Sequence, residues 1–188
     1  MPAPSIAIRP AVPADADTLR RLHRASLWGL CVFDYSLAEI ESILRHVQTL
    51  DPSLIERGRY YVATVAGEIA GSGGWSDDPD VHPVVRPANS NTGSAAAPPS
   101  AKMRAIFVNP KFARHGIGRS IMAHVEAEAR AAGFAVAEVL ATLTGARLGE
   151  CTGYESLRRV RLPLADGMQL DFVHMRKVLD ETFGKRAA

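Results

Sequence analysis

The sequence has few cysteines, no long apolar run and almost no net charge, and each shortage excludes a class of protein. Its two cysteines, Cys31 and Cys151, show no pairing pattern, which excludes a disulfide framework and suits a reducing compartment. No apolar run reaches the roughly 18 residues of a membrane helix, and the N-terminus lacks the features of a signal peptide. The net charge of +2 comes without a long basic cluster, which argues against nucleic acid as a partner. We therefore expect a soluble, cytoplasmic protein that binds neither membranes nor nucleic acid.

The length and composition indicate one globular domain. The chain has 188 residues, 47% of them hydrophobic and 22% charged, which is an ordinary balance for a packed domain. Residues 76–101 differ from the rest, because they hold five prolines among small and polar residues. A loop of this length inside a compact domain is either functional or disordered. We predict a single domain over residues 1–188 with a flexible insertion at 76–101.

Hydrophobic periodicity predicts a mixed α/β fold. The predicted strands are 5–9, 59–65, 68–75, 102–108, 134–143, 155–163 and 168–176. The predicted helices begin at an Asp15 cap and at a Ser36–Glu39 capping box, and continue with 117–131 and a short helix or loop at 145–152. Strands 102–108 and 134–143 flank helix 117–131, so we expect them to be parallel with a right-handed crossover.

Two further segments carry local signals. Gly71, Gly73 and Gly74 fall within strand 68–75, where glycine marks a bulge or a close approach of another backbone. A loop with Trp28, Phe33 and Tyr35 is predicted after the first helix. These aromatic residues could line a pocket or close the core over the sheet.

The segment from Val108 to Ser120 carries the strongest functional signal. A strand ends at Asn109-Pro110, a turn follows with Gly116 and Gly118, and a helix begins at once. The first N–H groups of a helix have no internal partners, and the helix dipole makes that end partly positive. Glycines let a phosphate approach these donors, so the segment predicts a diphosphate site.

The charge and the glycine spacing of this turn narrow the kind of site. Arg114, His115 and Arg119 add positive charge on the rim, whereas two glycines alone could form a tight loop with no ligand. A Walker loop is excluded because no Gly-Lys-Ser/Thr follows, and Ile121 in place of a third small residue disfavours a Rossmann fingerprint.

Residues 106–118 resemble the acyl-CoA-binding motif of the GCN5-related N-acetyltransferases (GNAT). That family carries Gln/Arg-x-x-Gly-x-Gly/Ala between a strand and a helix, and Gly116 and Gly118 match its glycine positions. The leading Gln/Arg position holds Ala113, and Arg114 follows one residue later. The resemblance covers nearly the whole chain. It implies a three-layer α/β (α+β) fold: a mixed, mostly antiparallel sheet of six or seven strands, one central parallel pair that splays apart, and helices on both faces.

The resemblance also implies an activity and a binding site. Acetyl-CoA would be the cosubstrate, and a primary amine of a small molecule or peptide would attack its thioester directly. The Val108 backbone N–H would polarise the thioester carbonyl as an oxyanion donor. The residues implied in acetyl-CoA binding are Ile106, Phe107, Val108, Arg114, His115, Gly116, Ile117, Gly118, Arg119 and Ser120. Family members are often dimers, so a homodimer through the last hairpin is a further expectation.

Proton transfer is less clearly specified. A protonated amine needs a base or a water path, and the candidates on the acceptor side are Asp34, Glu39, Asp77, Asp78 and His82. Each of these could equally be a cap, a turn residue or a solvated charge. The family often has a general-acid tyrosine four residues before a Gly-Phe/Tyr pair. Here Gly153-Tyr154 forms the pair and Gly149 occupies the tyrosine position. Cys151 or Tyr154 could replace it, or both could serve in packing.

Three hypotheses remain open. The first is an N-acetyltransferase, the second is a non-catalytic acyl-CoA-binding module, and the third is a structural partner with a vestigial site. The histidines lack the spacing of a metal site, so no metal is expected.

Overall fold

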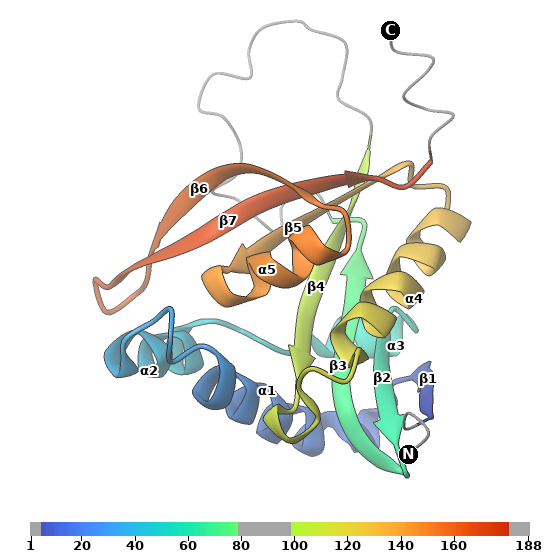
Figure 1. The fold of residues 1–188 in the computed structure, drawn as a ribbon, viewed down its shortest axis with the longest axis horizontal. Helices are drawn as coiled ribbons and strands as arrows, with labels where there is room; N and C mark the ends of the chain where they lie inside the picture. The colour runs from blue at the N-terminus through green and yellow to red at the C-terminus, as the bar shows by residue number, and fades with distance from the viewer. Residues whose placement is uncertain (1–4, 79–98, 181–188) are drawn as a thin grey trace, which may run out of the picture.

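The computed structural model describes residues 5–78 and 99–180, and these form one seven-stranded sheet in the order β1-β2-β3-β4-β5-β7-β6 (Figure 1). The strands are β1 (Ile6–Pro10), β2 (Tyr60–Val65), β3 (Glu68–Ser76), β4 (Ser100–Val108), β5 (Val136–Thr142), β6 (Glu155–Pro163) and β7 (Gln169–Val178). The helices are α1 (Ala16–Leu30), α2 (Leu37–His46), α3 (Pro52–Glu56), α4 (Ile117–Ala131) and α5 (Leu143–Cys151). Most of the predicted insertion at 76–101 lies outside the described residues.

One pair of strands is parallel, as the sequence predicted. β4 and β5 pair only from Ser100–Val136 to Met103–Val139. Beyond that point β4 continues along β3 and β5 continues along β7, all antiparallel, so the two central strands diverge (Figure 1). The mixed, mostly antiparallel sheet with a splayed parallel pair is therefore confirmed.

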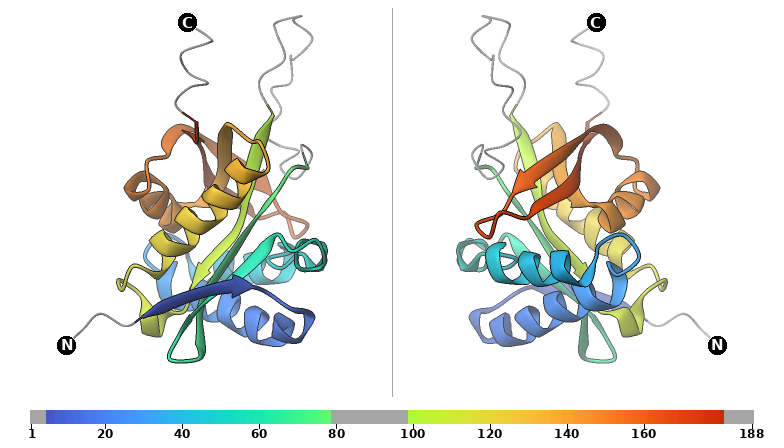
Figure 2. Two further views of the ribbon diagram at one scale, coloured as in Figure 1. Left: turned by 90° about the vertical axis from the view of Figure 1, so that its right-hand side faces the viewer. Right: turned by 90° about the vertical axis from the view of Figure 1, so that its left-hand side faces the viewer.

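Helices cover both faces of this sheet (Figure 2). On β2, Tyr61 and Ala63 join the core cluster beneath α4, whereas Tyr60 and Val62 join a cluster with α1 and α3 residues. Successive side chains of a strand point to opposite faces, so one strand contributes to both core layers. A third cluster joins α1 and α2 to β5, β6 and β7.

Capping explains where two of the helices begin. The predicted box at α2 is confirmed, because Ser36 N donates to Glu39 Oε2 at 2.7 Å and Glu39 N donates to Ser36 Oγ at 3.3 Å. Asp15 is the N-cap residue of α1, as predicted, but its side chain makes no capping hydrogen bond to that helix. The Asp15 carboxylate accepts from Val12 N at 2.9 Å and from the Arg9 guanidinium at 2.7 and 2.9 Å, so it braces the turn before α1.

The prediction was wrong at the end of α1 and was confirmed for the glycines of β3. α1 runs to Leu30, so Trp28, predicted in a loop, is helical. The irregularity predicted in β3 is confirmed by a register shift between Ser72 and Gly74. A Cβ on Gly71 would stand 2.7 Å from Ile121 Cδ1 on α4, so glycine lets α4 lie close against the sheet.

Candidate functional site

The gap between β4 and β5 exposes main-chain groups of β4. Gly71 pairs with Val108, and one residue later Asn109 N donates to Ala70 O at 2.9 Å. Facing residues in an antiparallel ladder alternate between hydrogen-bonded and non-bonded pairs. The Val108 N–H therefore points away from β3 and toward the gap, where β5 no longer pairs. Ile106, two residues earlier, lies with Ala105 opposite Gly73, where the regular alternation of β4 is interrupted.

A bulge in β4 opens this gap. Ser72 pairs with Phe107 and Gly74 with Arg104, so β4 has one extra residue over this stretch. Ala105 lies within the bulge and has φ +48°, which is unusual for a residue other than glycine. The bulge turns the end of β4 away from β5, as bulges do next to functional sites.

A buried polar network supports the bulge from the α1 side. The Tyr60 hydroxyl donates to Ala105 O at 3.0 Å and lies 3.0 Å from His23 Nε2. His23 also lies 3.1 Å from Ser72 Oγ and stacks on Phe107 with ring centroids 4.2 Å apart. Burial lowers the pKa of His23 to about 3, so its imidazole is neutral at physiological pH.

The turn before α4 has backbone donors that have no hydrogen-bond partner among the residues the structure describes. The first intrahelical bond runs from Ser120 N to Gly116 O at 2.9 Å, so the N–H groups of Ile117, Gly118 and Arg119 precede it. Gly116 has φ +82°, and no heavy atom lies within 4 Å of where its Cβ would stand. A Cβ on Gly118 would lie 3.4 Å from Val108 Cγ2. The donors of α4 and the end of β4 therefore adjoin.

The rim of this turn is positively charged and firmly held. Arg114, His115 and Arg119 are exposed, and His115 Nδ1 lies 2.8 Å from Ala113 O. Pro110 packs against α1, where a Cβ on Gly29 would stand 2.9 Å from Pro110 Cβ. The structure thus places the two segments predicted for acetyl-CoA binding, residues 106–108 and 114–120, side by side at Val108 and Gly118.

The two predicted substitutes for a general acid lie at the end of α5 and just after it. Cys151 is exposed at the end of α5. Tyr154 is buried beside Glu126, and burial together with that carboxylate raises its pKa. Glu126 lies nine residues after Ile117, roughly 13 Å along α4. Tyr154 is therefore set back from the turn, whereas Cys151 lies three residues after Leu148, which adjoins Gly118.

Gly149, at the usual tyrosine position, is packed against β7. Its Cβ would stand 2.7 Å from Met175 Sδ and 2.9 Å from Met175 Cε. Met175 is fully buried and belongs to the core beneath α4 and α5. The direction in which a side chain would leave Gly149 is therefore filled by the core.

The acidic residues predicted on the acceptor side make structural contacts through their carboxylates or, for Asp78, through the backbone. Asp34 accepts from Thr144 Oγ1 and Arg147, each at 2.7 Å, and Glu39 belongs to the α2 capping box. Asp77 pairs with Arg59 at 2.6 Å, and the hydrogen bond from that guanidinium lowers its pKa. Asp78 N donates to Ser76 Oγ at 3.0 Å, and His82 lies outside the described residues.

The predicted aromatic residues divide between core and surface. The Tyr35 hydroxyl donates to Asp171 O at 2.5 Å and accepts from Leu143 N at 2.9 Å, so it ties α5 to β7. Phe33 is 86% exposed. Trp28 lines an open hollow of about 300 Å³ between α1 and α2.

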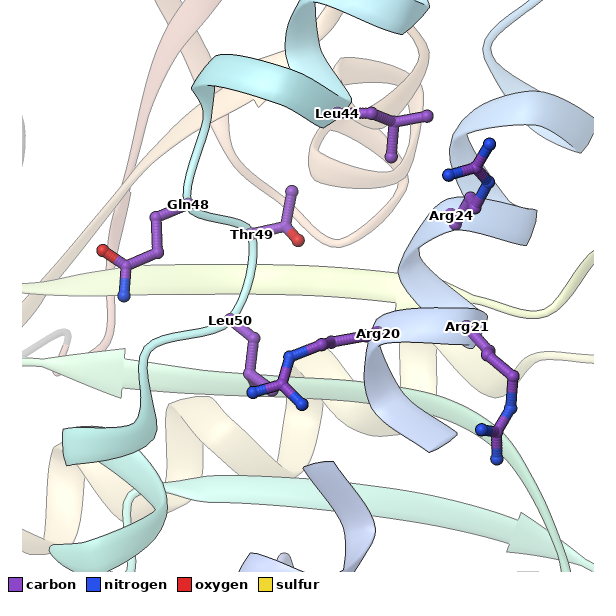
Figure 3. Close-up of a pocket in the computed structure, with 7 residues that line it drawn as sticks. All are labelled: Arg20, Arg21, Arg24, Leu44, Gln48, Thr49 and Leu50. Atoms are coloured by element: carbon purple, nitrogen blue, oxygen red, sulfur yellow. The ribbon is translucent and has the colours of Figure 1, made fainter. Parts of the chain in front are cut away.

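A second open hollow, of about 380 Å³, adjoins the first along α1 (Figure 3). Arg24 and Leu44 line both hollows. Thr49, on the segment after α2, also lines the larger one, and its Oγ1 lies 3.3 Å from His23 Nδ1. Thr49 therefore links the lining of this hollow to the polar network beneath the β4 bulge.

Sequence reasoning missed a charged cluster on the sheet. Lys102 on β4 donates to Glu138 on β5 at 2.5 Å, and His174 Nε2 on β7 lies 3.4 Å from the same carboxylate oxygen. The hydrogen bond with His174, followed by that with Lys102, lowers the pKa of Glu138 to about 2. A signal existed, because Glu138 interrupts an otherwise apolar strand.

Two absences are findings for the described part of the chain. Over residues 5–78 and 99–180, no group of three or more metal-binding side chains occurs. Within the same ranges, every helix is too short or too polar to cross a membrane.

The chain was compared with protein families and known proteins. The model of the acetyltransferase (GNAT) family matches residues 25–147. No curated protein matches the sequence. A GCN5-related N-acetyltransferase from Rhodopseudomonas palustris is similar in structure, with a TM-score of 0.71, 21% identity, and coverage of 95% of this chain and 98% of that one.

Two similar structures were solved with a ligand. PaiA N-acetyltransferase from Thermoplasma acidophilum, in complex with coenzyme A, has a TM-score of 0.63 and 16% identity, and the match covers 93% of this chain and 99% of that one. YncA from Salmonella typhimurium, with its cofactor acetyl-CoA, has a TM-score of 0.60 and 18% identity, with coverage of 94% and 95%. At these identities the similarity shows the fold.

Proposed function

Because this chain belongs to the acetyltransferase (GNAT) family, we propose that it transfers an acetyl group from acetyl-CoA to a primary amine of a small molecule or peptide. The observation that carries the proposal is the turn before α4. Its backbone donors and the open space at Gly116 adjoin a gap between two diverging strands.

Acetyl-CoA fits this arrangement on two grounds. The N–H groups of Ile117, Gly118 and Arg119 offer donors to a diphosphate, and the helix dipole favours negative charge there. The Val108 main chain faces the gap and can pair with an amide of the pantetheine arm, and Ile106 stays a predicted contact of the same arm. PaiA and YncA, which share the fold, were solved with coenzyme A and acetyl-CoA, which supports the same ligand here.

In the proposed reaction, bound acetyl-CoA supplies a thioester carbonyl that the amine attacks directly. The Val108 N–H would donate to the carbonyl oxygen as negative charge develops on it. One such donor contributes about 3–4 kcal/mol in other enzymes. The neutral network under Ala105 fixes the bulge, so this donor needs no rearrangement during the reaction.

The reaction can proceed without a general acid at position 149. A thiol has a pKa of about 8.5, so it departs as a thiolate far more readily than an alkoxide would. Glycine at position 149 has no side chain that could supply a proton, and Met175 fills the space beside it. We propose that the CoA thiolate leaves unassisted.

The glycine at position 149 favours a second candidate, a non-catalytic acyl-CoA-binding module. Such a module would keep the diphosphate site and lack turnover. Gly149 is consistent with this alternative, because a lost general acid can cost about 10²–10⁴ in rate. The cytoplasmic location and the homodimer stay predictions.

Release of free CoA thiol decides between the two candidates. The purified chain is incubated with acetyl-CoA and a panel of primary amines, and thiol is followed with a chromogenic reagent. We expect release that depends on both the amine and the enzyme. Binding of acetyl-CoA, seen as a rise in melting temperature, with no release for any amine would favour the module. If the chain neither binds acetyl-CoA nor releases thiol, both candidates are refuted.

A further inference from the structure

The cluster of Lys102, Glu138 and His174 lies where the parallel strands part. Lys102 pairs with Glu138, and the next pair, Met103 with Val139, is the last before β4 and β5 diverge (Figure 1). His174 pairs with Leu140, the first β5 residue beyond that point. The cluster therefore stands at the closed end of the gap into which the Val108 N–H points.

The cluster faces the α1–α2 side of the sheet. Leu140 on β5 and Phe172 on β7 pack in the core cluster with α1 and α2. Glu138 and His174 lie two residues from them on the same strands, and positions two apart share a face. The turn before α4 is on the opposite side, beside Val108 and Leu148. A ligand at the α4 turn and an acceptor from the α1–α2 side would thus meet at the gap.

The contacts assign different roles to the members. Glu138 Oε2 accepts from Lys102 Nζ at 2.5 Å and lies 3.4 Å from His174 Nε2. Lys102 Nζ also donates to Ser100 Oγ at 2.7 Å. The side chains are 14% exposed for Lys102, 19% for Glu138 and 9% for His174. A carboxylate held ionised by two donors is a poor proton acceptor.

His174 is the better acceptor. An ionised carboxylate only accepts, so a neutral His174 carries its hydrogen on Nε2, directed at Glu138. Its Nδ1 then has a free lone pair, and among the described residues that atom has no hydrogen-bond partner. A carboxylate that orients a histidine also stabilises the imidazolium that forms when the histidine takes a proton.

We propose that His174 is the catalytic base that takes the proton from the attacking amine, and that Glu138 is the residue that positions it. This inference rests on the proposed function. The ammonium form of the amine gives a proton to His174 Nδ1, which frees the nitrogen lone pair. The nitrogen then attacks the thioester carbonyl carbon, and its C–N bond forms as the C–S bond breaks. The second proton passes from nitrogen to water, and the CoA thiolate takes up a proton from water. The imidazolium afterwards returns its proton to solvent.

The test compares His174→Gln and Glu138→Gln with a matched control, His46→Gln. His46, the last residue of α2, also faces a carboxylate, but that carboxylate belongs to Asp166 between β6 and β7, with Nε2 3.3 Å from Asp166 Oδ2. Thiol release is measured as kcat and KM with the best amine of the panel, across pH, and again with hydroxylamine. Hydroxylamine is neutral at pH 7 and needs no base to free its lone pair.

We expect His174→Gln to lower kcat about 10²–10⁴-fold with an ordinary amine. The loss should shrink with hydroxylamine, and the acidic limb of the kcat/KM profile should disappear. Added imidazole should restore part of the rate of a His174→Ala variant. Glu138→Gln should lower kcat less and shift that limb, while His46→Gln should match the parent chain. The pH profile also senses Lys102, Arg104, Arg158 and Arg176, which share this face, so the limb is compared only among variants that keep all four.

The outcomes separate the two proposals. A parent chain that releases thiol, together with a His174→Gln variant that is equally active or equally impaired with both nucleophiles, would overturn the base while leaving the transferase intact. A parent chain that binds acetyl-CoA but releases no thiol with any amine would overturn both. Circular dichroism and the acetyl-CoA melting shift show whether each variant is folded. If His174→Gln is not, the hydroxylamine comparison is made with Glu138→Gln.

Discussion

Replacing Gly116 with alanine tests directly whether acetyl-CoA binds at the turn before α4. Gly116 has φ +82°, and nothing lies within 4 Å of its absent Cβ. Gly67, in the turn between β2 and β3, has φ +81° and equally open surroundings. The two glycines therefore impose the same backbone penalty on alanine, but only Gly116 stands beside the gap. Gly67→Ala is the matched control.

The expected magnitudes follow from this geometry. A left-handed conformation costs a residue other than glycine about 1–2 kcal/mol, which lowers the melting temperature of a chain this size by about 2–8 °C. Both variants should show that fall. Acetyl-CoA at 100 times its Kd should stabilise the parent chain by about 2.7 kcal/mol, a rise of about 5–10 °C. We expect Gly67→Ala to keep this rise and Gly116→Ala to lose most of it, because the methyl group occupies the approach to the backbone donors.

Thermal melting with and without acetyl-CoA, over a series of concentrations, measures both effects. An undiminished rise in Gly116→Ala would place the ligand elsewhere on the molecule. An equal loss in both variants would show that lowered stability, rather than the lost approach to α4, weakens binding.

Three further predictions concern the supports of the site. Gly149→Tyr should lower stability by about 1–3 kcal/mol without raising the rate of thiol release, because a Cβ there would stand 2.7 Å from Met175 Sδ; melting and turnover measure the two effects. Tyr60→Phe should lower the free energy of unfolding by about 1–3 kcal/mol and reduce turnover, because Ala105 O loses its donor. Tyr61→Phe is the control: its hydroxyl donates to Glu128 on the other face, so turnover should be unchanged. The pKa of Glu138 is lowered from 4.5 to about 2, so this group stabilises the fold above pH 4.5 and loses that contribution as the pH falls toward 2. Urea unfolding between pH 2 and 6 should show about 2–3 kcal/mol of this loss in the parent chain and not in Glu138→Gln. If the free energy of unfolding depends on pH equally in both proteins, the prediction is contradicted.

The best-predicted parts of the fold are those with local signals. The bounds of α4 were predicted correctly because Gly116 and Gly133, both with positive φ, stand at its two ends. The α2 capping box likewise depends on residues three apart. α3, only five residues long, was missed because a single turn has no measurable periodicity.

What the sequence could not predict depends on contacts between distant residues. Asp15 carries the features of a helix cap, but Arg9 and Val12 bind its carboxylate first. The pairing of Lys102 with Glu138, and of Glu138 with His174, follows from the strand order β4-β5-β7. That order places β7 rather than β6 beside β5, and the succession of elements along the chain does not contain this information.

The two departures from the family motif, Ala113 and Gly149, affect side chains, whereas the proposed acetyl-CoA site consists mainly of backbone groups. At Ala113 the motif loses a side-chain contact, but the donors of Ile117, Gly118 and Arg119 belong to the main chain and are unaffected. At Gly149 it loses an acid, and Met175 closes that space. Binding needs only the first set of groups, whereas proton transfer needs side chains, and the nearest candidates at the gap come from β5 and β7 instead of α5. We therefore expect proton transfer in this chain to depend on side chains of the sheet, and the His174→Gln variant to lose turnover.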